Sequence, residues 1–255
     1  MIKFFFTFDK TLKSQNLKKR LLKQHKNTPP KKADIIIVAG GDGYMLNSLK
    51  KYYRFKKPFY GINCGTYGFL MNGYNSNNLI KKTSKAKKIT INPLEVTSIY
   101  SQKKKSLIAI NEISLFRQSR QTAMLSLRIK KKIVIKKLIG DGVLISTPAG
   151  STAYNLSVHG PILSLNSGKL AITPISPFRP RRWKGKIVNN NSIIKLTNLD
   201  PKKRPIAAVA DNVEMRNIKS LTVKIKKNIN LVLLYDPSRN LSKRIKIEQL
   251  RKNFS

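Results

Sequence analysis

Acidic residues are scarce in this sequence: Asp and Glu together number 11 of 255 residues, against 52 Lys and Arg. The formal net charge is therefore +41. A charge of this size is typical of proteins that bind nucleic acid, anionic membranes or polyanionic ligands. The lysines are scattered along the chain, however, and do not gather into one stripe. We interpret most of the charge as a Lys-rich surface composition, and we expect no specific nucleic-acid partner.

Cysteine and histidine are nearly absent, with one Cys and two His. The single thiol, Cys64, excludes an internal disulfide and fits a reducing cytosol, so we expect a cytoplasmic protein. The few Cys and His residues form no metal-binding motif and no Ser/His/Asp or Cys/His set, which leaves hydrolase chemistry without support. Long hydrophobic runs are also missing. The N-terminal MIKFFFTF is too short for a signal peptide or a membrane span, and we expect no membrane partner.

The first part of the chain, residues 1–92, has the pattern of an α/β domain. Continuous apolar runs indicate strands that are buried on both faces, as in a parallel sheet. Helical periodicity and Gly turns separate these runs, which predicts βαβ connections. We expect strands over 1–8, 34–39 and 58–63 and helices over 12–25 and 44–53.

The pattern changes after residue 92, and residues 93–236 are predicted to form a mostly β domain. Several segments alternate apolar residues with Lys, as half-exposed antiparallel strands do. The basic tail, residues 237–255, is helix-like and is expected to return to the first domain. The expected strands are 94–100, 107–116, 123–129, 132–139, 142–146, 192–196, 206–210, 221–225 and 231–235.

Glycine-rich turns carry the strongest functional signal. GGDG at Gly40–Gly43 follows a strand and opens a helix, where backbone N–H groups can hold phosphate oxygens. A tight turn with Asp42 as a helix cap is the structural alternative. The longer run Gly140–Pro161, GDGVLISTPAGSTAYNLSVHGP, combines four glycines with Ser and Thr hydroxyls that suit a sugar or a base. Asn111-Glu112 offers one donor and several acceptors for a ribose or an adenine edge.

In this order and at these separations, GGDG, NE and GDG-x-x-x-STP-x-GSTAY-x-x-S resemble the NAD kinase family. GINCGTYGFL (61–70), ITPISPFRP (172–180) and VADN (209–212) are similar to further elements of that family, so the resemblance covers nearly the whole chain. It implies the two-domain NAD kinase fold and transfer of a phosphoryl group to the adenosine-ribose 2′-hydroxyl of NAD, giving NADP. NAD and ATP would be the substrates, with a divalent metal, Mg²⁺, whose ligands the motifs do not specify. A homo-oligomer, dimer or tetramer, is also expected.

Position by position, the resemblance also implies roles for individual residues. Asp42 would be the general base beside the 2′-hydroxyl, with Gly43 next to it. Asn111 and Glu112 would hold the adenosine, and Asp141 would face the nicotinamide end. Asp211 and Asn212 would lie near the pyrophosphate and the metal. The residues that would cradle the dinucleotide are Ala149, Thr152, Ala153, Tyr154, Asn155, Leu156 and Ser157.

Two alternative functions stay open at this point. A lipid or sphingoid kinase of related fold also carries a GGDGT-like turn, although the STPAGSTAY run argues against it. A basic nucleic-acid-binding protein would fit the net charge, but it would need clustered Lys and Arg with aromatic platforms, and no such motif is found.

Overall fold

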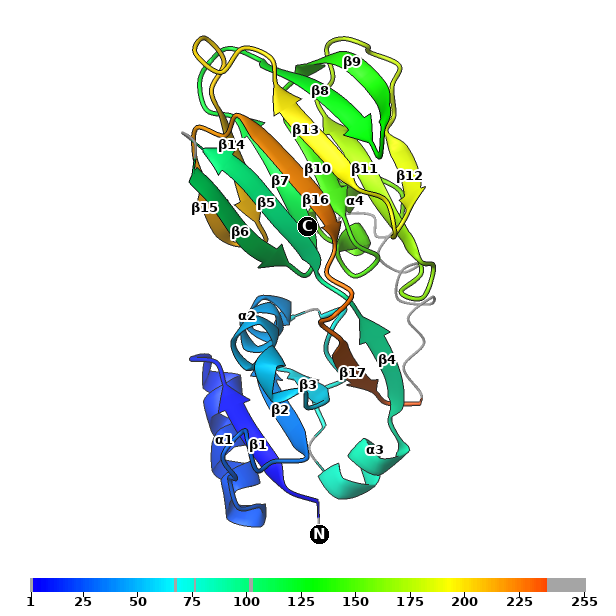
Figure 1. Ribbon diagram of the computed structural model, residues 1–255. Helices are drawn as coiled ribbons and strands as arrows, with labels where there is room; N and C mark the ends of the chain where they lie inside the picture. Colours follow the sequence, from blue (N-terminus) through cyan, green and yellow to red (C-terminus); the bar gives the residue numbers. More distant parts are fainter. Residues whose placement is uncertain (1, 67, 76, 101–102, 238–255) are drawn as a thin grey trace, which may run out of the picture. The chain divides into compact units, whose positions relative to one another are not determined.

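The computed structural model describes residues 2–66, 68–75, 77–100 and 103–237 (Figure 1). The chain divides into two compact units, one formed by Met1–Ile91 with Ile229–Ser255 and the other by Asn92–Asn228. The expected return of the tail falls on residues 237–255, of which all but residue 237 lie outside the described residues.

The first unit is built on a five-stranded sheet in the order β1-β2-β3-β17-β4. Strands β1, β2, β3 and β17 pair in parallel, whereas β4 pairs antiparallel to β17 at the edge. The helices α1, α2 and α3 connect the strands of this sheet and lie beside it (Figure 1). The strands are β1 (Phe4–Phe8), β2 (Ile35–Gly40), β3 (Phe59–Asn63), β4 (Lys87–Ile91) and β17 (Leu231–Tyr235), and the helices are α1 (Leu12–Gln24), α2 (Asp42–Tyr52) and α3 (Leu79–Lys85).

Continuous burial explains why β2 and β3 lie at the centre of this sheet. Every residue of both strands is buried, as the uninterrupted apolar runs predicted. Helix α1 begins after Thr11, whose side chain accepts a hydrogen bond from the Ser14 N–H. Its apolar residues Leu17 and Leu21 are fully buried in a core that includes strand residues of β1, β2 and β3.

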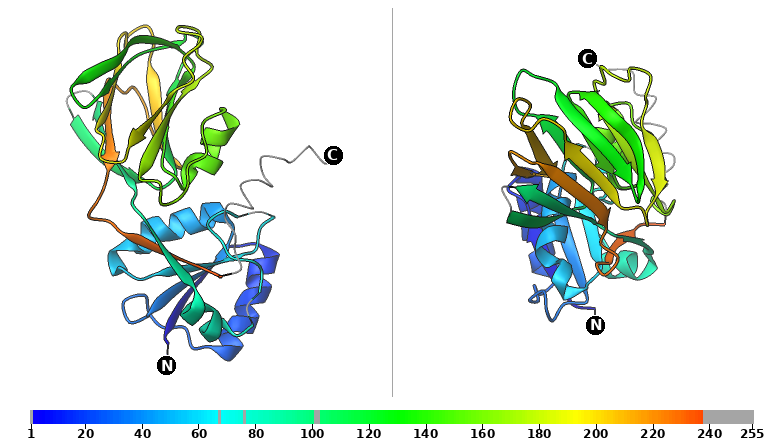
Figure 2. Two further views of the ribbon diagram at one scale, coloured as in Figure 1. Left: turned by 90° about the vertical axis from the view of Figure 1, so that its right-hand side faces the viewer. Right: turned by 45° about the horizontal axis from the view of Figure 1, so that its top comes forward.

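The second unit contains two six-stranded sheets in the orders β12-β11-β10-β7-β14-β15 and β6-β5-β16-β13-β8-β9. Figure 2 shows them as two layers, and one buried cluster joins the inner side chains of both sheets. Their strands are β5 (Leu94–Tyr100), β6 (Lys103–Ala109), β7 (Glu112–Arg117), β8 (Ala123–Ile129), β9 (Lys132–Gly140), β10 (Gly142–Ser146), β11 (Lys169–Ile175), β12 (Lys186–Asn189), β13 (Ile194–Asn198), β14 (Ile206–Ala210), β15 (Val213–Met215) and β16 (Ser220–Ile225).

Two expected boundaries differ from the structure. The single strand predicted over 107–116 is wrong, because the chain leaves one sheet after Ala109 and enters the other at Glu112. The second domain was expected to run to residue 236, whereas β17 adds to the sheet of the first unit. Its sequence LVLLY has the continuous apolar character of the central strands β2 and β3, and it pairs in parallel with β3.

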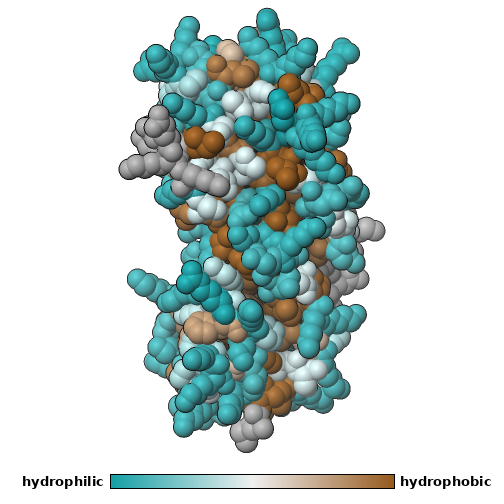
Figure 3. All heavy atoms as spheres, in the orientation of Figure 1, coloured by the Kyte–Doolittle hydropathy of each residue, from teal (hydrophilic) through white to brown (hydrophobic). Residues whose placement is uncertain are grey.

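Hydrophilic residues cover most of the face drawn in Figure 3, in agreement with the Lys-rich composition. None of the helices in the described residues has the length and apolar character needed to cross a membrane. Cys64 is buried, and burial raises the pKa of its thiol.

Candidate functional site

Asp42 joins the two glycine-rich turns of the first unit. Strand β2 ends at Gly40, Gly41 takes the N-cap position of α2, and Asp42 lies in the first helical turn. The Asp42 carboxylate accepts hydrogen bonds from the Phe69 N–H (2.7 Å) and the Leu70 N–H (3.0 Å). The alternative in which Asp42 caps its own helix is therefore wrong: the side chain fastens the segment after Gly68 to the GGDG turn.

The GGDG turn is crowded on one side and open on the other. A Cβ atom at Gly40 would lie 2.8 Å from Asp9 Oδ2 and 2.9 Å from Tyr44 Cδ1, so any side chain there would have to displace Asp9 and Tyr44. At Gly41 and Gly43, by contrast, a Cβ atom would meet no atom of the described residues within 4 Å. The start of α2 thus presents accessible backbone beside a carboxylate of fixed orientation, as an approaching phosphate or hydroxyl requires.

In the second unit, one carboxylate shapes the Asn111-Glu112 turn. Asp211 accepts three backbone hydrogen bonds, from Ile110 N–H (2.8 Å), Asn111 N–H (2.9 Å) and Glu112 N–H (3.2 Å). Asp211 itself adopts a left-handed backbone conformation with φ of 53°, directly after β14. The chain therefore changes sheets between β6 and β7 around this side chain, and the Asn111 and Glu112 side chains project from a fixed backbone.

The STPAGST segment holds the same turn from the other side. Thr147 donates its N–H to the Asn111 carbonyl oxygen (2.9 Å) and its hydroxyl to the Ile110 carbonyl oxygen (2.7 Å). A Cβ atom at Gly150 would lie 2.3 Å from the Asn111 carbonyl oxygen. Glycine at this position is required by the close approach of two backbones, which brings the GSTAY segment against the Asn-Glu pair.

Asn155 stabilises the loop from inside. It is completely buried in the short helix α4 (Tyr154–Ser157), and its Nδ2 donates to the Ser151 and Pro161 carbonyl oxygens at 3.3 and 2.9 Å. Its Oδ1 accepts a hydrogen bond from the Thr173 hydroxyl (2.7 Å) on β11. The resemblance placed Asn155 among the ligand-binding residues, but its side chain is fully engaged by protein groups and holds the loop in shape.

Tyr154 lies near Phe116 and is influenced by two of the predicted site residues, Glu112 and Asp141. Its ring lies 5.8 Å from the ring of Phe116, between centroids. Burial raises the pKa of the Tyr154 hydroxyl, and the negative charges of Glu112 and Asp141 raise it further. Two carboxylates from separate motifs, Glu112 and Asp141, therefore both act on the Tyr154 hydroxyl.

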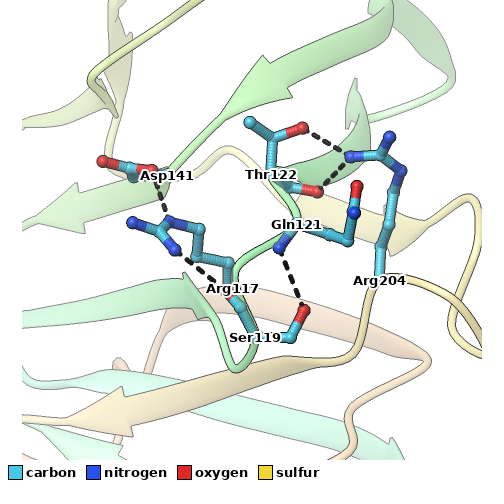
Figure 4. A network of polar contacts seen from close by, with 6 residues as sticks. All are labelled: Arg117, Ser119, Gln121, Thr122, Asp141 and Arg204. Carbon is cyan, nitrogen blue, oxygen red and sulfur yellow. Dashed lines mark hydrogen bonds and ion pairs between the residues drawn. The ribbon is translucent and has the colours of Figure 1, made fainter.

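Asp141 has a partner that the motifs do not reveal. Its carboxylate accepts a hydrogen bond from Arg117 Nε at 2.6 Å, and Arg117 also donates to the Ser119 carbonyl oxygen at 2.9 Å (Figure 4). Both side chains are about 40% exposed, at 40% and 39%, so solvent reaches the pair. Arg117 stands at the end of β7 outside any recognised motif, and no sequence signal pointed to it. Thr147 and Thr173 lie within the quoted STP and ITPISPFRP segments, but no role was assigned to either residue.

The remaining predicted residues differ in exposure. Ala149 is buried, whereas Thr152 and Leu156 are half-buried. Gly43, Ala153, Ser157 and Asn212 are exposed. Asn111 is notable because its Oδ1 atom is buried and accepts no hydrogen bond from the described residues. A buried acceptor of this kind costs free energy unless a donor reaches it, and a ligand hydroxyl or amino group would supply one.

The positions of the potential ligand side chains show what kind of Mg²⁺ site the described residues could form. Within the described residues, no three His, Cys, Asp or Glu side chains gather closely enough to form a metal cage. Mg²⁺ in phosphoryl-transfer enzymes is commonly held by one or two carboxylates together with substrate phosphates and water. A single carboxylate of the described residues, completed by substrate phosphates and water, fits that kind of site.

Comparisons with known proteins agree with these motifs. Residues 3–86 match the family model described as ATP-NAD kinase N-terminal domain, and residues 110–239 match the ATP-NAD kinase C-terminal domain. The NAD kinase of Zymomonas mobilis is 47% identical over 244 residues, which cover 94% of this chain and 95% of that protein. The NAD kinase of Caulobacter vibrioides is 41% identical, covering 92% of this chain and 91% of that protein.

Solved structures agree in fold. An NAD kinase from Archaeoglobus fulgidus, in complex with ATP, has a TM-score of 0.77 at 22% identity and covers 96% of this chain and 99% of that one. Yeast NADH kinase complexed with NADH has a TM-score of 0.75 at 23% identity, over 90% of this chain and 71% of that one. The family models and the relatives above 40% identity decide against the lipid kinase and nucleic-acid alternatives: the chain belongs to the NAD kinase family.

Proposed function

We propose that this protein phosphorylates the adenosine-ribose 2′-hydroxyl of NAD with ATP, giving NADP. NAD kinase activity follows from the family to which the chain belongs. The single observation that carries the finer proposal is the Asn111-Glu112 turn, where Asp211, Thr147 and Gly150 fix the backbone from two sides. The turn is preorganised, and its buried Asn111 Oδ1 accepts no hydrogen bond from the described residues, so it suits recognition of a nucleoside.

In the proposed mechanism, Asp42 accepts the proton of the attacking hydroxyl. Its hydrogen bonds to the Phe69 and Leu70 N–H groups hold the carboxylate in one orientation, which supports a positioned base. Phosphoryl transfer needs positioning and charge stabilisation more than covalent chemistry, so one carboxylate and a phosphate-binding turn suffice for this unit. Gly43, exposed at the same turn, leaves room for the substrate.

In the second unit, we assign nucleotide recognition to the residues around the Asn-Glu turn. Asn111 Oδ1 accepts a hydrogen bond from the adenosine, Glu112 accepts hydrogen bonds from ribose hydroxyls, and the Tyr154 ring packs against the ligand. Asp141, held by Arg117, binds the nicotinamide end. Ala149, Thr152, Ala153, Leu156, Ser157 and Asn212 line the dinucleotide path, and Asn155 acts through the loop that it fastens.

The divalent metal, Mg²⁺, belongs to the same proposal. When bound, it would supply positive charge that stabilises the transferred phosphoryl group. Asp42 is the carboxylate of the GGDG turn that such an ion would approach. A homo-oligomer, dimer or tetramer, and a cytoplasmic location stay predictions.

A coupled assay tests the reaction itself. Purified protein with NAD, ATP and MgCl₂ is expected to generate NADP, which glucose-6-phosphate dehydrogenase cycling detects. Sphingosine and diacylglycerol should remain unphosphorylated under the same conditions. No NADP above the level of an enzyme-free control would contradict the proposal.

Asp42→Asn is expected to lower kcat by about 10²- to 10⁴-fold, the usual contribution of a positioned general base. The amide offers one acceptor oxygen to the two N–H groups of Phe69 and Leu70, so the free energy of unfolding should also fall, by about 1–3 kcal/mol. Steady-state kinetics and thermal unfolding measure the two effects. Asp34→Asn is the matched control, because the exposed Asp34 carboxylate also accepts a backbone N–H, that of Lys3. A kcat for Asp42→Asn within about threefold of the control would assign Asp42 a purely structural role.

Asn111→Ala and Tyr154→Ala should weaken NAD binding more than they slow turnover. Each removes contacts made in the ground state, so we expect KM for NAD to rise about three- to tenfold, with a smaller change in kcat. The exposed Asn189→Ala, on β12, serves as the control. A change confined to the KM for ATP would show that the loop binds the other nucleotide.

A further inference from the structure

The second unit carries a hollow of about 470 Å³ that none of the motifs touches. This volume is in the range of sites that bind small molecules, about 300–1,000 Å³. It lies along β5 and β16 and the loops that precede β13 and follow β16. Its polar lining consists of three lysines, three asparagines and one glutamate: Lys224, Lys226, Lys227, Asn190, Asn191, Asn228 and Glu95.

Strand register places the hollow on the outer face of its sheet. Glu95 and Lys224 stand directly opposite each other in the β5–β16 ladder. Their neighbours Leu94, Val96 and Val223 are fully buried in the core between the two sheets. Because side chains alternate along a strand, Glu95 and Lys224 point away from that core. The hollow therefore opens on the side opposite to the sheet that contains β7, which begins at Glu112, and β10, which follows Asp141.

Charge in the hollow is only partly compensated. Lys224 Nζ lies 3.1 Å from Glu95 Oε2, and Lys226 Nζ hydrogen-bonds Glu95 Oε1. The hydrogen bond from Lys226, followed by that from Lys224, lowers the pKa of the Glu95 carboxyl, so Glu95 is ionised at neutral pH. Lys227 is exposed and has no carboxylate within ion-pair distance among the described residues. Three lysines and one glutamate thus leave two positive charges uncompensated.

We propose that this hollow is a second ligand site, which binds a compact multivalent anion bearing phosphate or carboxylate groups. Lys227 and Lys224 supply charge, and the asparagine amides supply neutral N–H donors at the rim. Glu95 pairs with Lys224 and Lys226 and so competes with a bound anion for these two ammonium groups. The site is distinct from the proposed nucleotide site, since the two have no residue in common.

Isothermal titration with sodium tripolyphosphate, and in parallel with sodium citrate, tests the proposal at about 0.15 M ionic strength, where diffuse attraction to the +41 surface is screened. The two titrants distinguish a phosphate ligand from a carboxylate ligand. We expect saturable binding of at least one of them. Lys227→Ala should raise its Kd about tenfold, as the loss of a charge-assisted contact does. Glu95→Gln should lower the Kd, because it removes the competing carboxylate and frees both lysines.

A control variant distinguishes binding in the hollow from non-specific attraction of the anion to the basic surface. Lys136→Ala, on the exposed part of β9, changes the net charge by the same amount as Lys227→Ala but lies outside the hollow. It should leave the Kd unchanged within about twofold. If Lys136→Ala weakened binding as much as Lys227→Ala, if Glu95→Gln failed to strengthen it, or if neither anion bound saturably, the proposal would be overturned. Because Lys227 is exposed and unpaired among the described residues, its variant is expected to fold normally, which thermal unfolding verifies.

Discussion

The Asp211 carboxylate is the constraint on which the second unit's site depends. Three consecutive backbone N–H groups, from Ile110 to Glu112, converge on it where the chain passes from one sheet to the other. Without an acceptor, these donors would be left unsatisfied at a partly buried turn, at a cost of about 1–3 kcal/mol each. The resemblance placed Asp211 near the pyrophosphate and the metal, whereas its observed contacts are structural. Asp211 fixes the backbone from which Asn111 and Glu112 project.

Residues of the motifs therefore divide into those that build the site and those that remain available to a ligand. Gly150, Thr147 and Asn155 are fully committed to backbone contacts and loop hydrogen bonds. Asn111 keeps a buried oxygen that accepts nothing from the described residues, and Tyr154 lies within reach of two carboxylates. In the first unit Asp42 belongs to both groups. Its carboxylate accepts hydrogen bonds from the Phe69 and Leu70 N–H groups, and the same carboxylate is the proposed general base. Rigidity of this kind lowers the cost of ordering the site when substrate binds.

The sequence predicted the elements whose signals are local. The apolar runs of β2 and β3 and the period of α1 follow from burial, and both central strands lie within one residue of the expected bounds. The break between β6 and β7 was missed, because the apolar run continues through Ile110 and the acid that turns the chain is about 100 residues away. Likewise, the Arg117–Asp141 pair and the Thr173–Asn155 hydrogen bond depend on strand pairing, which no local pattern encodes. The ordered motifs were sufficient to identify the family. Which of their residues hold the backbone in place, and which remain available to a ligand, is visible only in the three-dimensional structure.

The Asp211→Asn variant, analysed by thermal unfolding and by steady-state kinetics with NAD, tests most directly whether Asp211 fixes the backbone of the Asn111-Glu112 turn. Asparagine tolerates the left-handed backbone at this position, so the change removes acceptor capacity without adding strain. Asp200→Asn is the control, because Asp200 accepts a hydrogen bond from a single backbone N–H, that of Lys203, in an exposed turn. We predict that Asp211→Asn lowers the melting temperature and raises KM for NAD more than it lowers kcat. A fall in kcat with unchanged stability and unchanged KM would contradict the account and assign Asp211 to the reacting phosphate instead.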